Sequence, residues 1–192
     1  FSSLRNKGIE KATGDWVLQL DADEVVTEEL AREIKEVIKN GQKKKVLNPL
    51  FERHQKLIEK RDGPIGKKTG EVVAYFIPRR NMFLGRPLIH AGVYPDPAIR
   101  LIKKGKARLP GESVHEQMAV DGKVGWLQNY EEHYDSPTLK RYLWRLNRYT
   151  DLIASELKES KVNKSLFGFV DYVFLKPIYT FLSLFLRHKG FI

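Results

Sequence analysis

The stretch Trp16-Val17-Leu18-Gln19-Leu20-Asp21-Ala22-Asp23-Glu24 decides how this sequence folds. Its first five residues form a short apolar run after a Gly-Asp pair, which predicts a buried β-strand. Three carboxylates follow within the next four residues. In open α/β sheets, ligands bind at the carboxyl ends of the strands. The stretch therefore predicts a ligand site at one edge of a sheet.

The acidic residues after the predicted strand are candidates for holding a metal ion. Alternation along an extended chain places Asp21 and Asp23 on the same side. Two carboxylates in that position repel each other unless a cation or a bound hydroxyl lies between them. Mg²⁺ and Mn²⁺ bind through one or two carboxylates, with water and substrate phosphate as further ligands. The alternative is an acidic loop in which Asp23 or Glu24 only caps the next helix.

Helices and strands are predicted on both sides of this stretch by periodicity and end signals. Thr27 is a typical N-cap residue, and Asn40-Gly41 is a typical helix end. Ser136-Pro137 is a further helix start. The segment 42–70 is basic and poorly periodic. The predicted helices cover 4–12, 28–40, 51–58 and 137–157, the predicted strands cover 16–20, 71–77 and 82–85, and a hairpin is predicted over 98–109. This order indicates a mixed α/β domain followed by a helical extension.

The composition limits the classes of function. The chain has 192 residues with 34 Lys and Arg against 24 Asp and Glu, a formal charge of +10, which points to an anionic partner. It has no cysteine, which excludes a disulfide scaffold, a cysteine nucleophile and cysteine-based zinc sites. A nucleic-acid-binding module would use the lysines at 43–45, but it leaves the acidic strand end unexplained and no reading helix is recognisable. We therefore expect no nucleic-acid partner.

Two further groups of residues are candidates for chemistry. Val114-His115-Glu116 is not a zinc-protease helix, because no second histidine follows at the required spacing. Its glutamate can act as a general base for a hydroxyl group if it lies at the edge of a cleft. Arginines close to predicted strands are candidates for holding phosphate, with solvated surface as the alternative for each: Arg79, Arg80, Arg86 and Arg100. The remaining histidines, at 54, 90, 133 and 188, show no ligand spacing and are interpreted as structural or exposed.

The C-terminal segment, 166–192, is dense in aromatic and aliphatic residues. Its longest uncharged run, Pro177–Leu186, has ten residues, and a membrane-spanning helix needs about 20. Because Asp171 and Lys176 interrupt any longer candidate, we expect no spanning helix. Basic residues at 187–189 close the run, which predicts a segment that lies in a membrane interface. The alternative is a helix packed on the core of the domain.

Several of these motifs occur together in the order typical of one enzyme family. The first part is Arg5-Asn6-Lys7-Gly8 through Ala12, Gly14-Asp15-Trp16-Val17-Leu18 and the acidic stretch after it. The second part is Gly92-Val93-Tyr94-Pro95-Asp96, Ile99-Arg100-Leu101, Val114-His115-Glu116 and a tyrosine-rich helix. This pattern resembles the family 2 glycosyltransferases, in particular the bacterial lipopolysaccharide core β-glucosyltransferases. The resemblance is weakest over 42–70.

The resemblance implies a GT-A fold, an α/β sandwich with a nucleotide-binding half and an acceptor half. Residues 1–135 would form a partial GT-A domain, and 136–192 a C-terminal helical extension associated with a membrane. Members of the family begin with further strands that contact the nucleotide base. We therefore expect this chain to be incomplete at its N-terminus, and a catalytically inactive fragment is the alternative to an active enzyme.

The resemblance also implies an inverting sugar transfer from a nucleotide-diphosphate donor, with Mg²⁺ or Mn²⁺ as cofactor. Asp21 and Asp23, the two aspartates of a DXD motif, would bind the donor, and Asp23 would do so through the metal ion. Glu116 would be the catalytic base, with Asp96 as the reserve. Phosphate or acceptor groups would be bound by Arg79, Arg80, Arg100 and His115. The acceptor would be a lipopolysaccharide core or another glycolipid, so we expect a cytoplasmic enzyme, peripheral on the anionic inner face of the cytoplasmic membrane.

Overall fold

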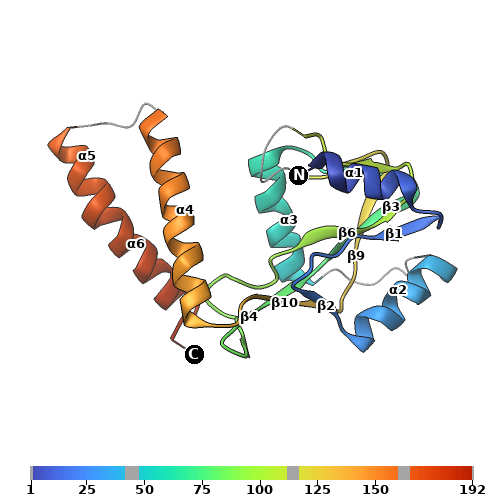
Figure 1. Ribbon diagram of the computed structural model, residues 1–192, viewed down its shortest axis with the longest axis horizontal. Helices are drawn as coiled ribbons and strands as arrows, with labels where there is room; N and C mark the ends of the chain where they lie inside the picture. The colour runs from blue at the N-terminus through green and yellow to red at the C-terminus, as the bar shows by residue number, and fades with distance from the viewer. Residues whose placement is uncertain (1, 42–47, 112–116, 160–164, 192) are drawn as a thin grey trace. The chain divides into compact units, whose positions relative to one another are not determined.

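The computed structural model describes residues 2–41, 48–111, 117–159 and 165–191. The chain divides into two compact units. The first combines Phe1–Arg80 with Pro95–His133, and the second combines Asn81–Tyr94 with Tyr134–Ile192. Helices and strands are mixed, as the sequence predicts (Figure 1).

A four-stranded sheet forms the centre of the first unit. Its strand order is β1-β6-β3-β9, with β1 at Trp16–Leu18, β6 at Ala98–Lys103, β3 at Val72–Ile77 and β9 at Lys123–Trp126. β6 runs antiparallel to both of its neighbours, and β3 and β9 are parallel. β1 is thus the predicted strand before the acidic residues, and its register places Leu18 opposite Leu101.

Helices cover both faces of β3. Leu30, Ile34 and Val37 of α2 (Glu28–Asn40) form one core cluster with Tyr75 and Ile77 of the strand. On the other side, aromatic rings connect α3 (Pro49–Asp62) to the sheet: the Phe51 and Trp126 centroids are 4.8 Å apart, and those of Phe76 and Trp126 are 4.7 Å apart. Successive strand residues point to opposite faces. Because β3 is buried on both faces, its sequence is a continuous apolar run.

The ends of the helices follow the sequence signals closely in this unit. Helix α1 covers Ser2–Lys11 and buries Ile9. Thr27 caps α2, whose last turn is closed by Gly41 at a φ of 69°, a value that favours glycine. Helix α3 is longer than the predicted segment, because Asn48 caps its start and Gly63 ends it. Ile38 of α2 is 42% exposed and lies outside the core cluster that Leu30, Ile34 and Val37 form.

The remaining strands form a second four-stranded sheet and a separate two-stranded pair. A second sheet has the order β2-β10-β4-β5, with β2 at Glu24–Val26, β10 at Glu131–Ser136, β4 at Arg79–Phe83 and β5 at Arg86–Pro87. The predicted hairpin over 98–109 is wrong, because β7 (Ala107–Arg108) pairs with β8 (Ala119–Val120) and β6 belongs to the first sheet. The turn at Lys104-Gly105 exists, but the backbone N–H of Asp121 binds the carbonyl of Lys106 at 2.8 Å and so aligns β8 with β7.

Helix α4 covers Leu139–Glu159 and begins later than predicted. Thr138, and not Ser136, acts as its cap: the Thr138 Oγ1 accepts a hydrogen bond from the Arg141 N–H at 3.2 Å. The carbonyl of Thr138 also accepts the first helical bond, from the Tyr142 N–H, at 3.0 Å. Pro137 therefore lies before the cap and not inside the helix.

The C-terminal helix is continuous through the residues that were expected to interrupt it. It consists of α5 (Leu166–Val170), η1 (Asp171–Leu175), α6 (Lys176–Leu182) and η2 (Ser183–Arg187). The Lys176 N–H binds the carbonyl of Asp171, a wide turn that carries the helix into Pro177. The resulting 22-residue helix, with a mean hydropathy of 1.5, is long and apolar enough to cross a membrane by length and composition alone. Asp171 and Lys176 thus do not interrupt the helix, and the expectation that no segment here is long enough to span a membrane is wrong.

The cap of α2 gives a test of the fold. The Thr27 hydroxyl accepts a hydrogen bond from the Leu30 N–H at 3.2 Å and donates one to the Tyr130 carbonyl at 2.9 Å. We expect Thr27→Ala to lower the free energy of unfolding by about 1–2 kcal/mol, because both bonds are lost. Urea denaturation followed by circular dichroism measures this. The control Thr27→Ser keeps the hydroxyl and should stay within about 0.5 kcal/mol of the wild type; an equal loss in both variants would contradict the capping role.

Candidate functional site

The acidic residues form a tight turn at the end of β1. The chain leaves the strand after Leu18. The Glu24 N–H donates to the Asp21 carbonyl at 3.1 Å, and the Asp21 N–H donates to the Glu24 carboxylate at 2.9 Å. The extended alternation that placed Asp21 and Asp23 on one side therefore does not continue past the strand. Each carboxylate instead has partners of its own.

Arg100 of β6 is the central cation of this turn. Its side chain is only 6% exposed and donates to Asp21 at 2.8 Å and to Glu24. The Nε of Arg100 also lies 3.6 Å from a carboxylate oxygen of Glu131 on β10. One guanidinium thus connects the acidic turn to two strands. The predicted role of Arg100 in binding phosphate or acceptor stays a prediction, but in the structure its charge faces three internal carboxylates.

Helix α1 contributes two polar side chains that tie the turn and the β7 region together. Arg5 forms an ion pair with Asp21. Asn6 makes a reciprocal pair of hydrogen bonds with the backbone of Leu109, at 2.9 and 3.0 Å. The sequence analysis noted Arg5-Asn6 only as part of a family pattern. The structure gives both residues a positioning role.

The other predicted arginines also have internal partners. Arg79 donates to Asp96 at 2.7 Å and lies 3.4 Å from Glu24. The guanidinium of Arg80 lies 3.4 Å from the centre of the Tyr130 ring, in a cation–π contact. Arg79 therefore extends the charge network from the acidic turn to Asp96, the reserve base. Arg86 lies on β5 in the second unit and is exposed.

Asp23 is the carboxylate of the turn that has no arginine partner among the described residues. Its side chain is 34% exposed and lies 3.7 Å from the Nε2 of His133 on β10. The pairing of β2 with β10 places His133 opposite Glu24. Burial, followed by the positive charge of Arg79, lowers the pKa of His133 and favours its neutral form. From the sequence His133 was interpreted as structural or exposed, because β-pairing across about a hundred residues leaves no local signal.

The charge network fixes the ionisation of Asp21. Burial acts to raise the pKa of Asp21, but the attraction and hydrogen bonds of Arg100 and Arg5 outweigh it, and the net shift is downward. Asp21 is therefore an ionised, arginine-bound group that orients the turn. Because both neighbouring guanidinium groups face its oxygens, it is a poor ligand for a metal ion.

Glu131 behaves in the opposite way. It is fully buried, and neither of its carboxylate oxygens has a hydrogen-bond partner within the described part of the chain. Burial and the nearby negative charge of Glu24 raise its pKa to about 7, against the attraction of Arg100. A carboxylic acid that is half protonated near neutral pH therefore lies directly behind the acidic turn.

A divalent metal ion fits this site only through Asp23. In the described ranges, His, Asp and Glu side chains form no group of three that could hold a metal ion. Mg²⁺ is nevertheless commonly bound by one or two carboxylates together with water and substrate phosphates. Asp23 meets that requirement, because its carboxylate is partly exposed and its neighbour His133 is uncharged. The predicted base Glu116 and the predicted ligand His115 lie outside the described residues.

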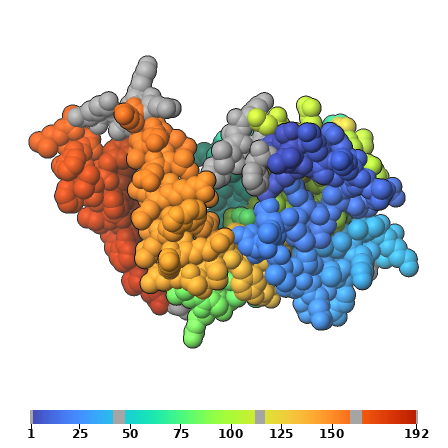
Figure 2. All heavy atoms as spheres, viewed as in Figure 1, coloured from blue at the N-terminus to red at the C-terminus, as the bar shows by residue number. Residues whose placement is uncertain are grey.

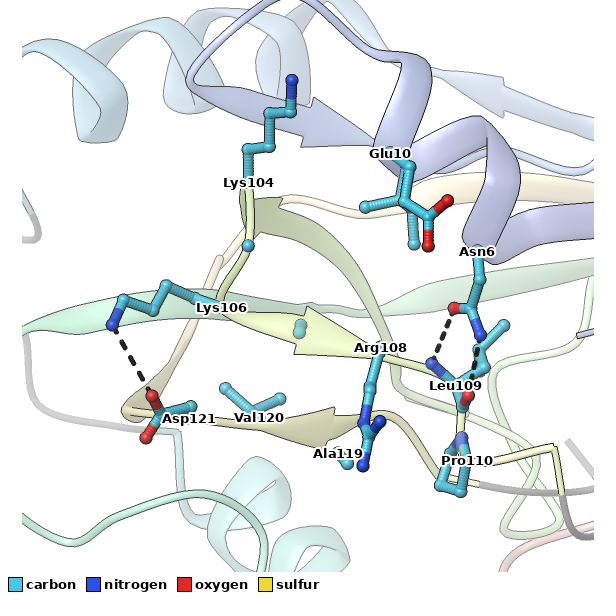
Figure 3. Close-up of a pocket in the computed structure, with 13 residues that line it drawn as sticks. Asn6, Glu10, Lys104, Lys106, Arg108, Leu109, Pro110, Ala119, Val120 and Asp121 are labelled. Atoms are coloured by element: carbon cyan, nitrogen blue, oxygen red, sulfur yellow. Dashed lines mark hydrogen bonds and ion pairs between the residues drawn. The ribbon is translucent and has the colours of Figure 1, made fainter. Parts of the chain in front are cut away.

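A separate cavity of about 810 Å³ lies between α1 and the β7–β8 pair (Figure 3). Its lining includes Asn6, Glu10, Lys104, Lys106 and Arg108. Figure 3 shows the Asn6 carboxamide bonded to Leu109 at one side of this cavity, and Lys106 facing Asp121 on the other. None of the predicted site residues that the structure describes lines it.

The raised pKa of Glu131 predicts how stability depends on pH. Its pKa in the folded state is about 7, above the ordinary 4.5, so the folded chain binds the extra proton between these values. Stability should therefore fall as the pH rises from about 4.5 to 7, by up to about 1.4 kcal/mol per pH unit. Glu131→Gln removes this dependence and should be more stable than the wild type at pH 8.

The measurement is the free energy of unfolding in urea for both proteins at several pH values. Glu132→Gln, the adjacent glutamate on β10, is the matched control, and it should keep the wild-type dependence on pH. If the free energy of unfolding depended on pH in the same way for the wild type and Glu131→Gln, Glu131 would be ionised in the folded state over the whole range, which would contradict the prediction.

Part of the chain matches a family of known proteins. Residues 1–84 match the family model described as Glycosyl transferase family 2. The matched part contains α1, the acidic turn, α2 and β3, and it ends before Asp96 and Arg100. No solved structure matches the chain. The first 84 residues thus support a family 2 glycosyltransferase domain, and the acidic turn lies within the matched part.

Proposed function

We propose that this chain carries the acidic turn and acceptor side of an inverting glycosyltransferase, which transfers a sugar from a nucleotide-diphosphate donor to a glycolipid. The observation that carries the proposal is the acidic turn in the part of the chain that matches the family. In that turn, arginines bind Asp21 and Glu24, whereas Asp23 has no arginine partner among the described residues and is 34% exposed, about as much as Asp21. A site for a diphosphate needs such a fixed, asymmetric arrangement, because the donor itself is strongly anionic.

In the proposed site, the three carboxylates have different tasks. Asp21 and Glu24 hold the shape of the turn through Arg100. Asp21 would also contact the bound donor. Asp23 would hold a Mg²⁺ or Mn²⁺ ion, which when bound would neutralise the charge of the donor diphosphate. These different roles follow from the partners of each side chain. They do not require the three carboxylates to bind the same metal ion.

The transfer itself needs a base for the acceptor hydroxyl. The hydroxyl oxygen forms a bond to the anomeric carbon while the bond from that carbon to the diphosphate oxygen breaks, and the hydroxyl proton goes to the base. Attack from the face opposite the leaving group inverts the configuration. We propose Glu116 as that base. Asp96 accepts two hydrogen bonds from Arg79, at 2.7 and 3.1 Å, which suits it to orienting Arg79.

The acceptor side is proposed from charge and from the resemblance to enzymes of the lipopolysaccharide core. The formal charge of +10 suits an anionic, phosphorylated acceptor. The exposed apolar C-terminal helix suits an acceptor held in a membrane. We therefore propose a lipopolysaccharide-core or related glycolipid acceptor at the anionic inner face of the cytoplasmic membrane.

The role of Asp23 is tested by substitution in the full-length protein. With a panel of nucleotide sugars and a glycolipid acceptor, we expect Asp23→Asn to lower kcat at least a hundredfold, about 2.7 kcal/mol of transition-state stabilisation. The measurement is release of the nucleoside diphosphate as a function of Mn²⁺ concentration. Asp15→Asn, at the opposite end of β1, is the control and should retain activity. Full turnover in Asp23→Asn would remove the assignment.

The role of Glu116 needs a test that separates binding from chemistry. We expect Glu116→Gln to lower kcat by a factor of about 10²–10⁴, as for loss of a general base, with the Kd of the donor unchanged. Stopped-flow turnover gives the first value and calorimetry with the nucleoside diphosphate gives the second. The control is Glu112→Gln in the same segment. A large loss of donor affinity in Glu116→Gln would contradict its role as the base.

A further inference from the structure

The C-terminal helix, Leu166–Arg187, exposes apolar side chains around its whole circumference. None of its apolar window is buried. At about 100° per residue, its exposed side chains point in every direction around the axis. They are Leu166, Phe167, Phe169, Val170, Tyr172, Val173, Phe174, Leu175, Ile178, Tyr179, Phe181, Leu182, Leu184, Phe185 and Leu186. A helix that is apolar on all sides belongs in a protein core or in lipid, and in this structure it is not in a core.

The two charged residues inside this helix neutralise each other. The Lys176 Nζ lies 3.3 Å from the Asp171 carboxylate and 3.3 Å from the centre of the Tyr172 ring. Ionisable residues within membrane segments usually pair in this way, because an isolated charge is costly in hydrocarbon. Asp171 and Lys176, which interrupt the apolar run in the sequence, are therefore compatible with contact between this helix and lipid.

Helix α4 is amphipathic and cationic in its first half. One side carries an apolar stripe of Leu139, Tyr142, Leu146, Tyr149 and Ile153. The first half also carries Lys140, Arg141, Arg145 and Arg148, and no acidic residue occurs over 139–150. The guanidinium of Arg148 lies 5.7 Å from the centre of the exposed Trp144 ring. Figure 2 shows the side chains of α4 at the surface.

The cationic half of α4 and the basic end of the C-terminal helix lie at the same end of the second unit. The Phe83 and Tyr142 ring centroids are 5.1 Å apart, and the Ala91 N–H donates to the His188 carbonyl at 2.8 Å. Both contacts are made to the segment Asn81–Tyr94. Arg187 and Lys189 therefore add to the positive charge near the start of α4.

We propose that α4 and the helix Leu166–Arg187 together form a lipid-binding surface for bilayers that contain acidic phospholipids. The C-terminal helix and the apolar stripe of α4 enter the acyl region of the bilayer. The basic side chains of α4 and of the end of the C-terminal helix bind the lipid phosphates. A second copy of the chain suits this surface poorly, because the two cationic ends would repel each other. The proposal deepens the membrane part of the proposed function, and it is tested without donor or acceptor.

Two cations are suited to a test because their charges are not used inside the unit. Arg141 donates to the Asp135 carbonyl, and Arg145 forms an ion pair with the Asp135 carboxylate. Lys140 and Arg148, in contrast, make no ion pair with any described residue. The double substitution Lys140→Glu with Arg148→Glu therefore changes the surface charge without removing an ion pair, and of the contacts described above it removes only the one between Arg148 and Trp144. Lys35→Glu with Lys39→Glu, on the exposed side of α2, is the matched control.

The experiment is vesicle flotation of the full chain at 150 mM salt. Vesicles are made of phosphatidylcholine alone or with a 30% share of phosphatidylglycerol. We expect binding to both, with at least a tenfold stronger partition to the acidic vesicles, since each cation near an anionic surface adds to binding. Lys140→Glu with Arg148→Glu should remove that preference, and the control on α2 should keep it.

Ile178→Glu with Leu182→Glu, at two exposed positions, should reduce binding to both kinds of vesicle at least tenfold. Circular dichroism verifies that each variant remains folded. Absence of flotation with the wild type would overturn the proposal, and so would an equal loss of preference in the α2 control. Flotation in a protein that transfers no sugar would leave the lipid surface intact and contradict only the proposed enzymatic function.

Discussion

The ion pairs of Arg100 are the interaction on which the rest of the site depends. A guanidinium with 6% exposure is stable inside a protein only when carboxylates compensate the loss of hydration. Asp21 and Glu24 provide that compensation at the end of β1, and Glu131 adds a third acid that burial drives toward its protonated form. The pair of β1 with β6 brings this cation beside the turn, so the main sheet and the charge network stabilise each other.

This network explains why the three acids of the turn differ. Asp21 is held by two arginines and Glu24 is buried against Arg100 and Arg79, whereas Asp23 faces the neutral imidazole of His133. Asp21 and Asp23 are about equally exposed, at 32% and 34%, so it is the lack of an arginine partner among the described residues that sets Asp23 apart. The family match over residues 1–84 includes this turn, although the cation that organises it lies beyond the matched part. The proposed donor site thus depends on a strand far along the chain.

Local signals in the sequence were sufficient for the elements near the acidic stretch. Thr27 and Gly41 set the ends of α2, and the apolar run of β3 follows from helices on both of its faces. The partners of the acidic residues could not be predicted, because they come from distant strands and from α1. Alternation along an extended chain could not predict how Asp21 and Asp23 lie, because a turn starts at Asp21. The C-terminal helix was misjudged because ion pairing of Asp171 with Lys176 is invisible to a count of charges.

The most direct measurement is a double-mutant cycle between Arg100 and Glu24, read as free energies of unfolding. Each single change, Arg100→Gln or Glu24→Gln, leaves buried charge uncompensated and should be costly. If Arg100 organises the turn, the double variant should be more stable than the sum of the single losses predicts, with a coupling energy of about 2 kcal/mol or more. A coupling below about 0.5 kcal/mol would show that the two groups act independently, and it would contradict the account.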